Sequence, residues 1–274
     1  MKRKEFSYLA EYNAFGIKDE EVQNPFLLEL SKDCYEHLEV QEPDDSAPVI
    51  AFLCGREKGH YTIDYAYAYA LRYAHIRLLD YEHCVDQLAG CHGLVLPGGA
   101  FASKKEYYAP EVDKSTLEEP GIRSQAYVDA FHTALMMGIP ILGICAGAQV
   151  IAGECGGLLY PDRSYQPYTL EHKTKDMYAH EVIIKKGSFF HQIVGCTTLM
   201  TNSRHKERLK DLPYFTGFEI YARTPDGVPE AWGSKRDNIL CVQWHPEDYV
   251  VKGDPYHKKI YSWLLNEATK FQLG

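Results

Sequence analysis

Short apolar runs alternate with helix-like segments between about residues 48 and 154, and this alternation restricts the fold more than any other feature. The apolar runs are PVIAFLC, IRLL, GLVLP and IPILGI, and the segments that follow them are YTIDYAYAYALRYA, EHCVDQLAG, RSQAYVDAFHTALMMG and AGAQVIAGE. The Tyr-Ala alternation in the first segment also fits a strand, but its alanines and its length favour a helix. Strands that alternate with helices form a parallel sheet covered on both faces. We therefore predict an α/β fold with a central, mostly parallel sheet.

The two ends of the chain have a different pattern. After Gly157, the runs HEVII, TTLM, GFEIYA, VPEAW and ILCVQW are short strand candidates separated by turn signals such as KKG and PDG, and a helix is expected over residues 255–271. Residues 1–47 are rich in Glu and Asp, contain one plausible helix over residues 25–38 and end in a linker, QEPDDSAP. We predict a partly helical N-terminal extension over residues 1–47 and one domain over residues 48–274.

Composition restricts the class of partner and the compartment. The net charge of −9 argues against a nucleic acid or an anionic membrane as a partner. MKRKEF is not followed by an apolar run of signal-peptide length, and no segment of membrane-spanning length is found. The eight scattered cysteines are typical of reduced thiols. We expect a cytoplasmic protein without nucleic-acid or membrane partners, and we leave a homodimer open.

The stretch GICAGAQ places Cys145 between two glycines where a predicted strand meets a predicted helix. Ligands of parallel sheets bind at the carboxyl ends of the strands. Glycines at 143 and 147 allow a sharp turn, because a Cβ at either position would collide with neighbouring backbone. The pattern predicts a nucleophile elbow in which the start of the helix favours a thiolate. A buried structural cysteine is the alternative that the motif alone leaves open.

A thiolate nucleophile needs a base, and VQWHPED offers one directly after a predicted strand. His245 and Glu247 are two residues apart, so in an extended chain they would face the same side. Glu247 could then hold one imidazole nitrogen while the other faces Cys145, as in a triad of nucleophile, base and orienting group. A charged surface turn is the alternative for this motif alone.

Together, GICAGAQ, LPGG and QWHPE resemble the class I glutamine amidotransferase-like superfamily, whose Cys-His-Glu triad matches Cys145, His245 and Glu247. The motifs GGLLYPD, AHEVII, TNSRH and PDGVPEA are similar, in that order, to those of the γ-glutamyl-γ-aminobutyrate hydrolase family of γ-glutamyl peptidases. The resemblance covers about residues 48–250. It implies a flavodoxin-like three-layer α/β/α core and a small-molecule γ-glutamyl substrate that is hydrolysed through a glutamyl thioester. It implies no metal and no organic cofactor.

The resemblance also implies an oxyanion hole. Gly98 and Gly99 of LPGG would lie across from the nucleophile, and an N–H group of one of them would act together with that of Ala146. The family usually has Arg where this chain has Ala146, and it has an acidic segment where this chain has AFASKKEYY. These departures surround the substrate more than the chemistry. We therefore predict that the amine leaving group differs from γ-aminobutyrate and is bulkier or differently charged.

Four further residues match substrate-side positions of the family. Gln149 lies four residues after the nucleophile, on the same helix face, and matches the position that contacts the glutamyl group. The other three match a substrate-side loop and are Asn202, Ser203 and His205. The long segment over residues 100–121 is expected to contact the leaving group through Phe101, Tyr107, Tyr108, Lys104 and Lys105. A disordered surface loop without influence on specificity is the alternative.

The sequence motifs leave other functions open. The same triad could belong to a glutamine amidotransferase that supplies ammonia in trans, to a hydrolase of folate-like polyglutamates, or to a binding or regulatory module on the same fold. The cysteines and histidines of EHCVDQLAGCH could suggest a metal site, but their spacing is not that of a zinc ribbon or finger, so a structural role is favoured.

Overall fold

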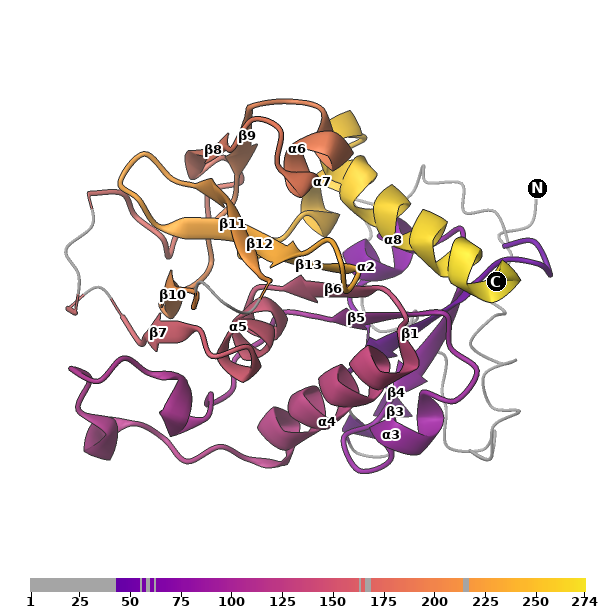
Figure 1. Cartoon of the computed structure of the whole chain (residues 1–274), viewed down its shortest axis with the longest axis horizontal. Helices are drawn as coiled ribbons and strands as arrows, with labels where there is room; N and C mark the ends of the chain where they lie inside the picture. The colour runs from indigo at the N-terminus through magenta and orange to yellow at the C-terminus, as the bar shows by residue number, and fades with distance from the viewer. Residues whose placement is uncertain are drawn as a thin grey trace.

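A nine-stranded mixed sheet forms the centre of the fold in this computed structural model (Figure 1). The structure describes residues 43–54, 56–57, 60–61, 63–162, 164–165, 169–213 and 217–274. The helix predicted over residues 25–38, like most of the predicted extension, lies outside the described residues. The strand order is β4-β1-β5-β6-β13-β12-β11-β8-β9.

The first five strands of this order run parallel and the other four antiparallel to their neighbours. The parallel strands are β4 (His75–Leu79), β1 (Val49–Leu53), β5 (Gly93–Leu96), β6 (Ile141–Ile144) and β13 (Ile239–Val242). The antiparallel strands are β12 (Pro229–Ser234), β11 (Glu219–Arg223), β8 (His180–Ile184) and β9 (Thr198–Thr201). Two small pairs complete the strands: β7 (Leu158–Tyr160) with β10 (Arg208–Asp211), and β2 (Arg56–Glu57) with β3 (His60–Tyr61).

Helices cover both faces of the sheet (Figure 1). One face is covered by α2 (Tyr65–Ala70), α6 (Phe189–Val194), α7 (Glu247–Val251) and α8 (Pro255–Leu273), and the other by α3 (Cys84–Gln87), α4 (Ile122–Met137) and α5 (Ala146–Glu154). Strand β1 shows why two cores form: Ile50 and Phe52 pack into the first, and Ala51 and Leu53 into the second. Successive side chains of a strand point to opposite faces, so a strand between two helix layers is apolar throughout. The predicted three-layer α/β/α fold with added strands is confirmed.

Several predicted boundaries were wrong. The helix expected over residues 61–74 is only α2, because the Asp64 side chain caps it by accepting a hydrogen bond from the Ala66 amide, and Tyr61 pairs in β3 instead. The helix expected in EHCVDQLAG shrinks to the four residues of α3, since Asp80 binds the amides of Glu82 and His83 just before it. Side-chain hydrogen bonds of this kind compete with helix formation.

Three neighbouring parallel strands bring the sequence motifs to one edge of the sheet. Leu96 of β5 is opposite Gly143 of β6, and Ile144 of β6 is opposite Val242 of β13. LPGG, GICAGAQ and QWHPE therefore begin side by side at the carboxyl ends of these strands, where α/β sheets bind ligands.

Candidate active site

Cys145 occupies a strained turn between β6 and α5. Its φ of 50° and ψ of −109° lie in a region that residues with a Cβ rarely adopt. The Cys145 amide donates to the Val242 carbonyl, which continues the sheet, while its own carbonyl accepts from the Gln149 amide, which starts the helix. A Cβ at position 147 would come within 2.0 Å of the Leu96 carbonyl oxygen, and one at 143 within 3.0 Å of the Ala148 Cα. The predicted need for both glycines is confirmed.

His245 and Glu247 form a close pair, although not for the reason that the spacing suggested. The distance from His245 Nδ1 to Glu247 Oε1 is 2.7 Å, and the side chain of Glu247 is buried while that of His245 is 14% exposed. The chain is not extended here, because Pro246 has helical dihedral angles and Glu247 is the first residue of α7. The pair therefore depends on a helix start rather than on strand periodicity.

The environment of His245 favours a charged imidazole. Burial by itself lowers the pKa of His245, but the Glu247 carboxylate and a hydrogen bond with the Cys145 side chain outweigh it, and the pKa is raised well above the ordinary value. The same interactions show that the cysteine and histidine motifs meet in space, although 100 residues separate them in the sequence.

Gly98 fills the space beside the cysteine and the histidine. A Cβ at Gly98 would lie 2.6 Å from His245 Cε1 and 3.2 Å from Cys145 Cβ. The Gly98 amide donates to the Tyr67 hydroxyl at 3.1 Å, and that hydroxyl lies 3.4 Å from His245 Nδ1. Gly98 thus leaves room for the cysteine–histidine contact, while its N–H group is held by Tyr67.

Gly99, the next residue of the LPGG turn, has a φ of 152°, a conformation that favours glycine. Its neighbour is Arg123, whose guanidinium donates to the Gly98 carbonyl and to the Tyr127 hydroxyl, each at 3.2 Å. Arg123 therefore fixes the backbone of the LPGG turn from the side of α4.

Two tyrosines that were not predicted from the sequence also belong to this site. Tyr67 contacts Gly98 and His245 as described, and the Tyr261 hydroxyl donates to Glu247 Oε2 at 3.3 Å. Both are buried in the core on the α2–α8 face of the sheet. Their contacts join segments far apart in the sequence, so periodicity could identify each as buried but not as part of the site.

The other predicted site residues occupy the region between the elbow helix and the QWHPE turn. Gln149 Nε2 donates to the Glu207 carbonyl at 2.7 Å and to Gln243 Oε1 at 3.2 Å. Asn202 binds the His245 backbone on both sides, since its Oδ1 accepts from the His245 amide and its Nδ2 donates to the His245 carbonyl. The two Asn202 contacts hold the QWHPE turn, and direct substrate contacts of Gln149 and Asn202 stay a prediction.

Ser203 and His205 lie further along the same loop. The Ser203 hydroxyl donates to the His172 carbonyl at 2.7 Å, and His205 Nδ1 lies 3.0 Å from the Glu207 carbonyl. Both residues are buried. His205 also lines a cavity, and the predicted substrate contacts of Ser203 and His205 both stay predictions.

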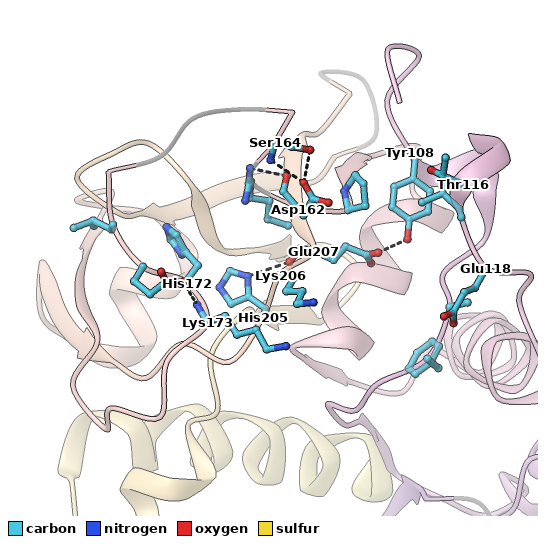
Figure 2. A pocket seen from close by; sticks show the side chains of 17 residues that line it. Tyr108, Thr116, Glu118, Asp162, Ser164, His172, Lys173, His205, Lys206 and Glu207 are labelled. Atoms are coloured by element: carbon cyan, nitrogen blue, oxygen red, sulfur yellow. Dashed lines mark hydrogen bonds between the residues drawn. The ribbon is translucent and has the colours of Figure 1, made fainter. Parts of the chain in front are cut away.

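A cavity of about 1220 Å³ lies next to this loop (Figure 2). Phe101, Tyr108, His172 and His205 are among the residues that line it, whereas Cys145 and His245 are not. The cavity is connected with the elbow through Gln149, which binds the backbone of the lining residue Glu207.

The long segment over residues 100–121 packs against the domain. The Tyr108 hydroxyl binds Glu207, and that of Tyr107 binds Glu154 of α5. Lys104 forms an ion pair with Glu154 at 2.9 Å. Of the aromatic residues expected to contact the leaving group, Phe101 and Tyr108 line the cavity and Tyr107 does not.

The fold is that of the class I glutamine amidotransferase-like proteins. A crystal structure from Thermoplasma acidophilum, described provisionally as part of a GMP synthase, is similar with a TM-score of 0.59 and 18% identity over 83% of this chain and 96% of that chain. The chain belongs to the Peptidase C26 family, whose model matches residues 65–247.

Two relatives carry different names within this class. A Schizosaccharomyces pombe protein provisionally named glutamine amidotransferase is 32% identical over 182 residues, which cover 64% of this chain and 69% of the relative. The γ-glutamyl-γ-aminobutyrate hydrolase of Escherichia coli strain K12 is 32% identical over 167 residues, which cover 57% of this chain and 63% of the relative. The predicted resemblance is confirmed. In the described parts of the chain, no helix combines the length and the apolar character that crossing a membrane requires.

Proposed function

We propose that this protein is a cysteine-dependent hydrolase that cleaves a γ-glutamyl amide through a glutamyl thioester. The observation that carries the proposal is the meeting of a strained cysteine with a carboxylate-bound histidine at the carboxyl ends of β6 and β13. The name of the Escherichia coli relative supports the γ-glutamyl half of the substrate.

Each group has one role in this reaction. The Cys145 sulfur attacks the amide carbonyl carbon, and the carbonyl electrons move onto the oxygen. His245 holds the proton from the thiol and gives it to the nitrogen of the leaving amine when the carbon–nitrogen bond breaks. Water then attacks the thioester, His245 accepts its proton, and the thiolate leaves. Glu247 orients the imidazole and stabilises its positive charge throughout.

The developing oxyanion needs two donors, and the geometry favours one pair. The Ala146 amide lies at the start of α5, directly after the nucleophile. Since the N–H group of Gly98 donates to Tyr67, we assign the second donor to Gly99. Such donors contribute about 100- to 1000-fold to the rate in comparable sites.

A glutamine amidotransferase that supplies ammonia in trans is the second candidate. The names of the Schizosaccharomyces pombe relative and of the Thermoplasma structure favour it. Its chemistry at Cys145 would be the same, with ammonia as the leaving group. A module that only binds or regulates would not need the strained conformation of Cys145.

The deciding experiment labels the isolated chain with an electrophilic glutamine analogue and identifies the modified peptide by mass spectrometry. We expect a single adduct on Cys145. Cys145→Ala should lower hydrolysis of γ-glutamyl amides by roughly 1000-fold or more. The matched control is Cys54→Ala, since Cys54 also follows a central strand but has no elbow.

Two results would contradict the proposal. A Cys145→Ala protein with unchanged hydrolysis, or an adduct on another thiol, would exclude the mechanism. Turnover of glutamine only when a synthetase is added would favour the amidotransferase instead.

A further inference from the structure

Three histidines and one glutamate form a buried cluster separate from the triad. His172, His180, His205 and Glu230 each offer one ligand atom, and these atoms all lie within 4.8 Å of one another. Their side chains are at most 5% exposed. His180 starts β8, Glu230 lies in β12, and the two other histidines come from the loops that border the cavity, where Figure 2 shows them close together.

The spacing within the cluster suits a tetrahedral metal. Glu230 Oε1 lies 3.3 Å from His172 Nδ1, 3.4 Å from His205 Nε2 and 3.9 Å from His180 Nε2. Zinc bonds of about 2.0–2.1 Å in tetrahedral geometry place neighbouring ligand atoms roughly 3.3 Å apart. Two of the three distances to Glu230 match this value and the third exceeds it by about half an ångström, while the most widely separated ligand atoms, within 4.8 Å of one another, would approach by up to about 1.5 Å on binding the ion.

The contact at Nδ1 of His205 determines which of its two ring nitrogens carries the lone pair. His205 Nδ1 lies 3.0 Å from the Glu207 carbonyl, which can only accept, so Nδ1 carries the hydrogen. In the neutral ring, Nε2 then turns a lone pair toward the carboxylate of Glu230. A lone pair and a carboxylate at 3.4 Å repel each other unless a cation lies between them.

His180 repeats this arrangement. Its Nδ1 lies 3.2 Å from the Thr201 hydroxyl, which itself donates to the His180 carbonyl. The hydroxyl therefore accepts from Nδ1, and the His180 Nε2 lone pair also faces the cluster. Metal-bound histidines generally have their other ring nitrogen held in this way.

The charge of the cluster also calls for a cation. Glu230 is fully buried, and within the described residues neither of its carboxylate oxygens accepts a hydrogen bond. A second carboxylate, that of Asp226, lies 3.7 Å from His172 Nε2. Burial of a carboxylate without a compensating charge is costly, and a divalent cation would balance both.

We propose that His172, His180, His205 and Glu230 bind one zinc ion, or a divalent transition metal of similar preference, in a structural site. Imidazole and carboxylate donors suit zinc, and four protein ligands leave no position for a substrate. The metal would join four segments of the chain. These are the loop before β8 with His172, β8 with His180, the loop after β9 with His205, and β12 with Glu230. That last loop also carries Asn202, which holds the backbone of His245. The metal therefore acts on the shape of the active site and takes no part in bond cleavage.

The metal content of the full chain tests this proposal independently of the proposed function. The protein is prepared without a histidine tag and with Cys145→Ala, because a catalytic thiol could bind zinc itself. We expect about one zinc per chain by elemental analysis, loss of the metal with a strong chelator, and a higher Tm when buffered Zn²⁺ is returned. Co²⁺ in the same site should give the intense visible absorption of tetrahedral coordination.

Two variants and one control locate the metal. Glu230→Gln and His180→Gln should each abolish stoichiometric binding and the Tm response to Zn²⁺. His83→Gln should keep both, because His83 is an exposed histidine that pairs with the carboxylate of Asp80 outside the cluster.

The alternative to a metal is a protonated His205 paired with Glu230, which would also remove the repulsion between them. The metal content and the Tm response to Zn²⁺ distinguish this ion pair from a metal site. Less than about a tenth of a metal per chain, together with a Tm that does not respond to Zn²⁺, would overturn the proposal. So would full metal content in both cluster variants. Should the variants fail to fold, the zinc titration of the intact cluster still decides.

Discussion

At the residue scale, the neighbours of Cys145 hold it in a strained conformation. The conformation of Cys145 costs on the order of 1–3 kcal/mol, and such strain persists only where the surroundings enforce it. Here the hydrogen bond to Val242 and the start of α5 enforce it. The elbow motif was sufficient to predict this turn, because its glycines and its cysteine are adjacent in the sequence.

The partner of His245 allows a prediction about pH. Glu247→Gln removes the carboxylate that raises the pKa of His245, so this pKa should fall toward or below its ordinary value of about 6.5. A histidine whose pKa is higher in the folded than in the unfolded state stabilises the folded protein. This stabilisation is complete at pH values below the pKa of the unfolded state, and it is lost as the pH rises through the pKa of the folded state. Glu247→Gln should therefore lower the free energy of unfolding more at pH 6 than at pH 10.

Urea unfolding at the two pH values measures this difference, with Glu267→Gln as the control. Glu267 forms an exposed pair with Lys270 on α8 and should show little effect at either pH. The alkaline limb of kcat/KM should also move to lower pH in Glu247→Gln, because His245 would lose its proton earlier. An equal loss of stability at both pH values would contradict the assignment.

At the scale of elements, the sequence predicted long segments well and short ones poorly. Helix α4 lies within one residue of the expected range, and β1 lies inside its apolar run. Helix α6 was not predicted, although Ser188 caps it and Gly195 ends it in the left-handed conformation, both of which are readable signals. Strands β7 and β10 were missed because they are short and depend on each other for pairing.

The shortened helix α2 places one tyrosine on the active site, and this gives a second prediction. Tyr67→Phe removes the hydroxyl that accepts from the Gly98 amide and lies next to His245. One such hydrogen bond is worth about 1 kcal/mol, so kcat should fall roughly fivefold with little change in KM.

Tyr69→Phe is the matched control, since it changes the same helix at a tyrosine that packs with Tyr65 and Arg72 instead. Steady-state kinetics of both variants on one γ-glutamyl amide provide the measurement. Equal activity of Tyr67→Phe and the wild type would show that the hydroxyl does not position the LPGG turn.

At the scale of the whole molecule, the sheet separates two cores, and the site lies where three central strands end. The alternation of strands and helices predicted this location, because parallel strands all have their carboxyl ends on the same side of the sheet. The cavity and the histidine cluster could not be predicted in the same way. The cavity joins segments from different parts of the chain, and the cluster joins two loops with strands β8 and β12, so both depend on how the added antiparallel strands pack.

The cavity leads to the last prediction, which concerns the amine half of the substrate. Phe101 lines the cavity two residues after Gly99 and packs on Tyr127 with ring centroids 4.6 Å apart. The lining residues carry charges of both signs that largely offset each other, so size should decide more than charge; they are Lys173, Lys206, Arg208, Glu118, Asp162, Glu171 and Glu207. We expect γ-glutamyl amides with bulky or aromatic leaving groups to be cleaved with a higher kcat/KM than γ-glutamyl-γ-aminobutyrate.

Phe101→Ala tests this expectation in a panel of γ-glutamyl amides. Loss of the ring should lower kcat/KM for the bulky substrates by roughly tenfold and leave small amides almost unchanged, since one apolar contact discriminates by about 1–3 kcal/mol. Tyr107→Phe is the control, because Tyr107 belongs to the same segment but packs on α5 away from the cavity. A preference for γ-glutamyl-γ-aminobutyrate in the wild type, or the same ranking in Phe101→Ala, would show that the leaving group does not enter this cavity.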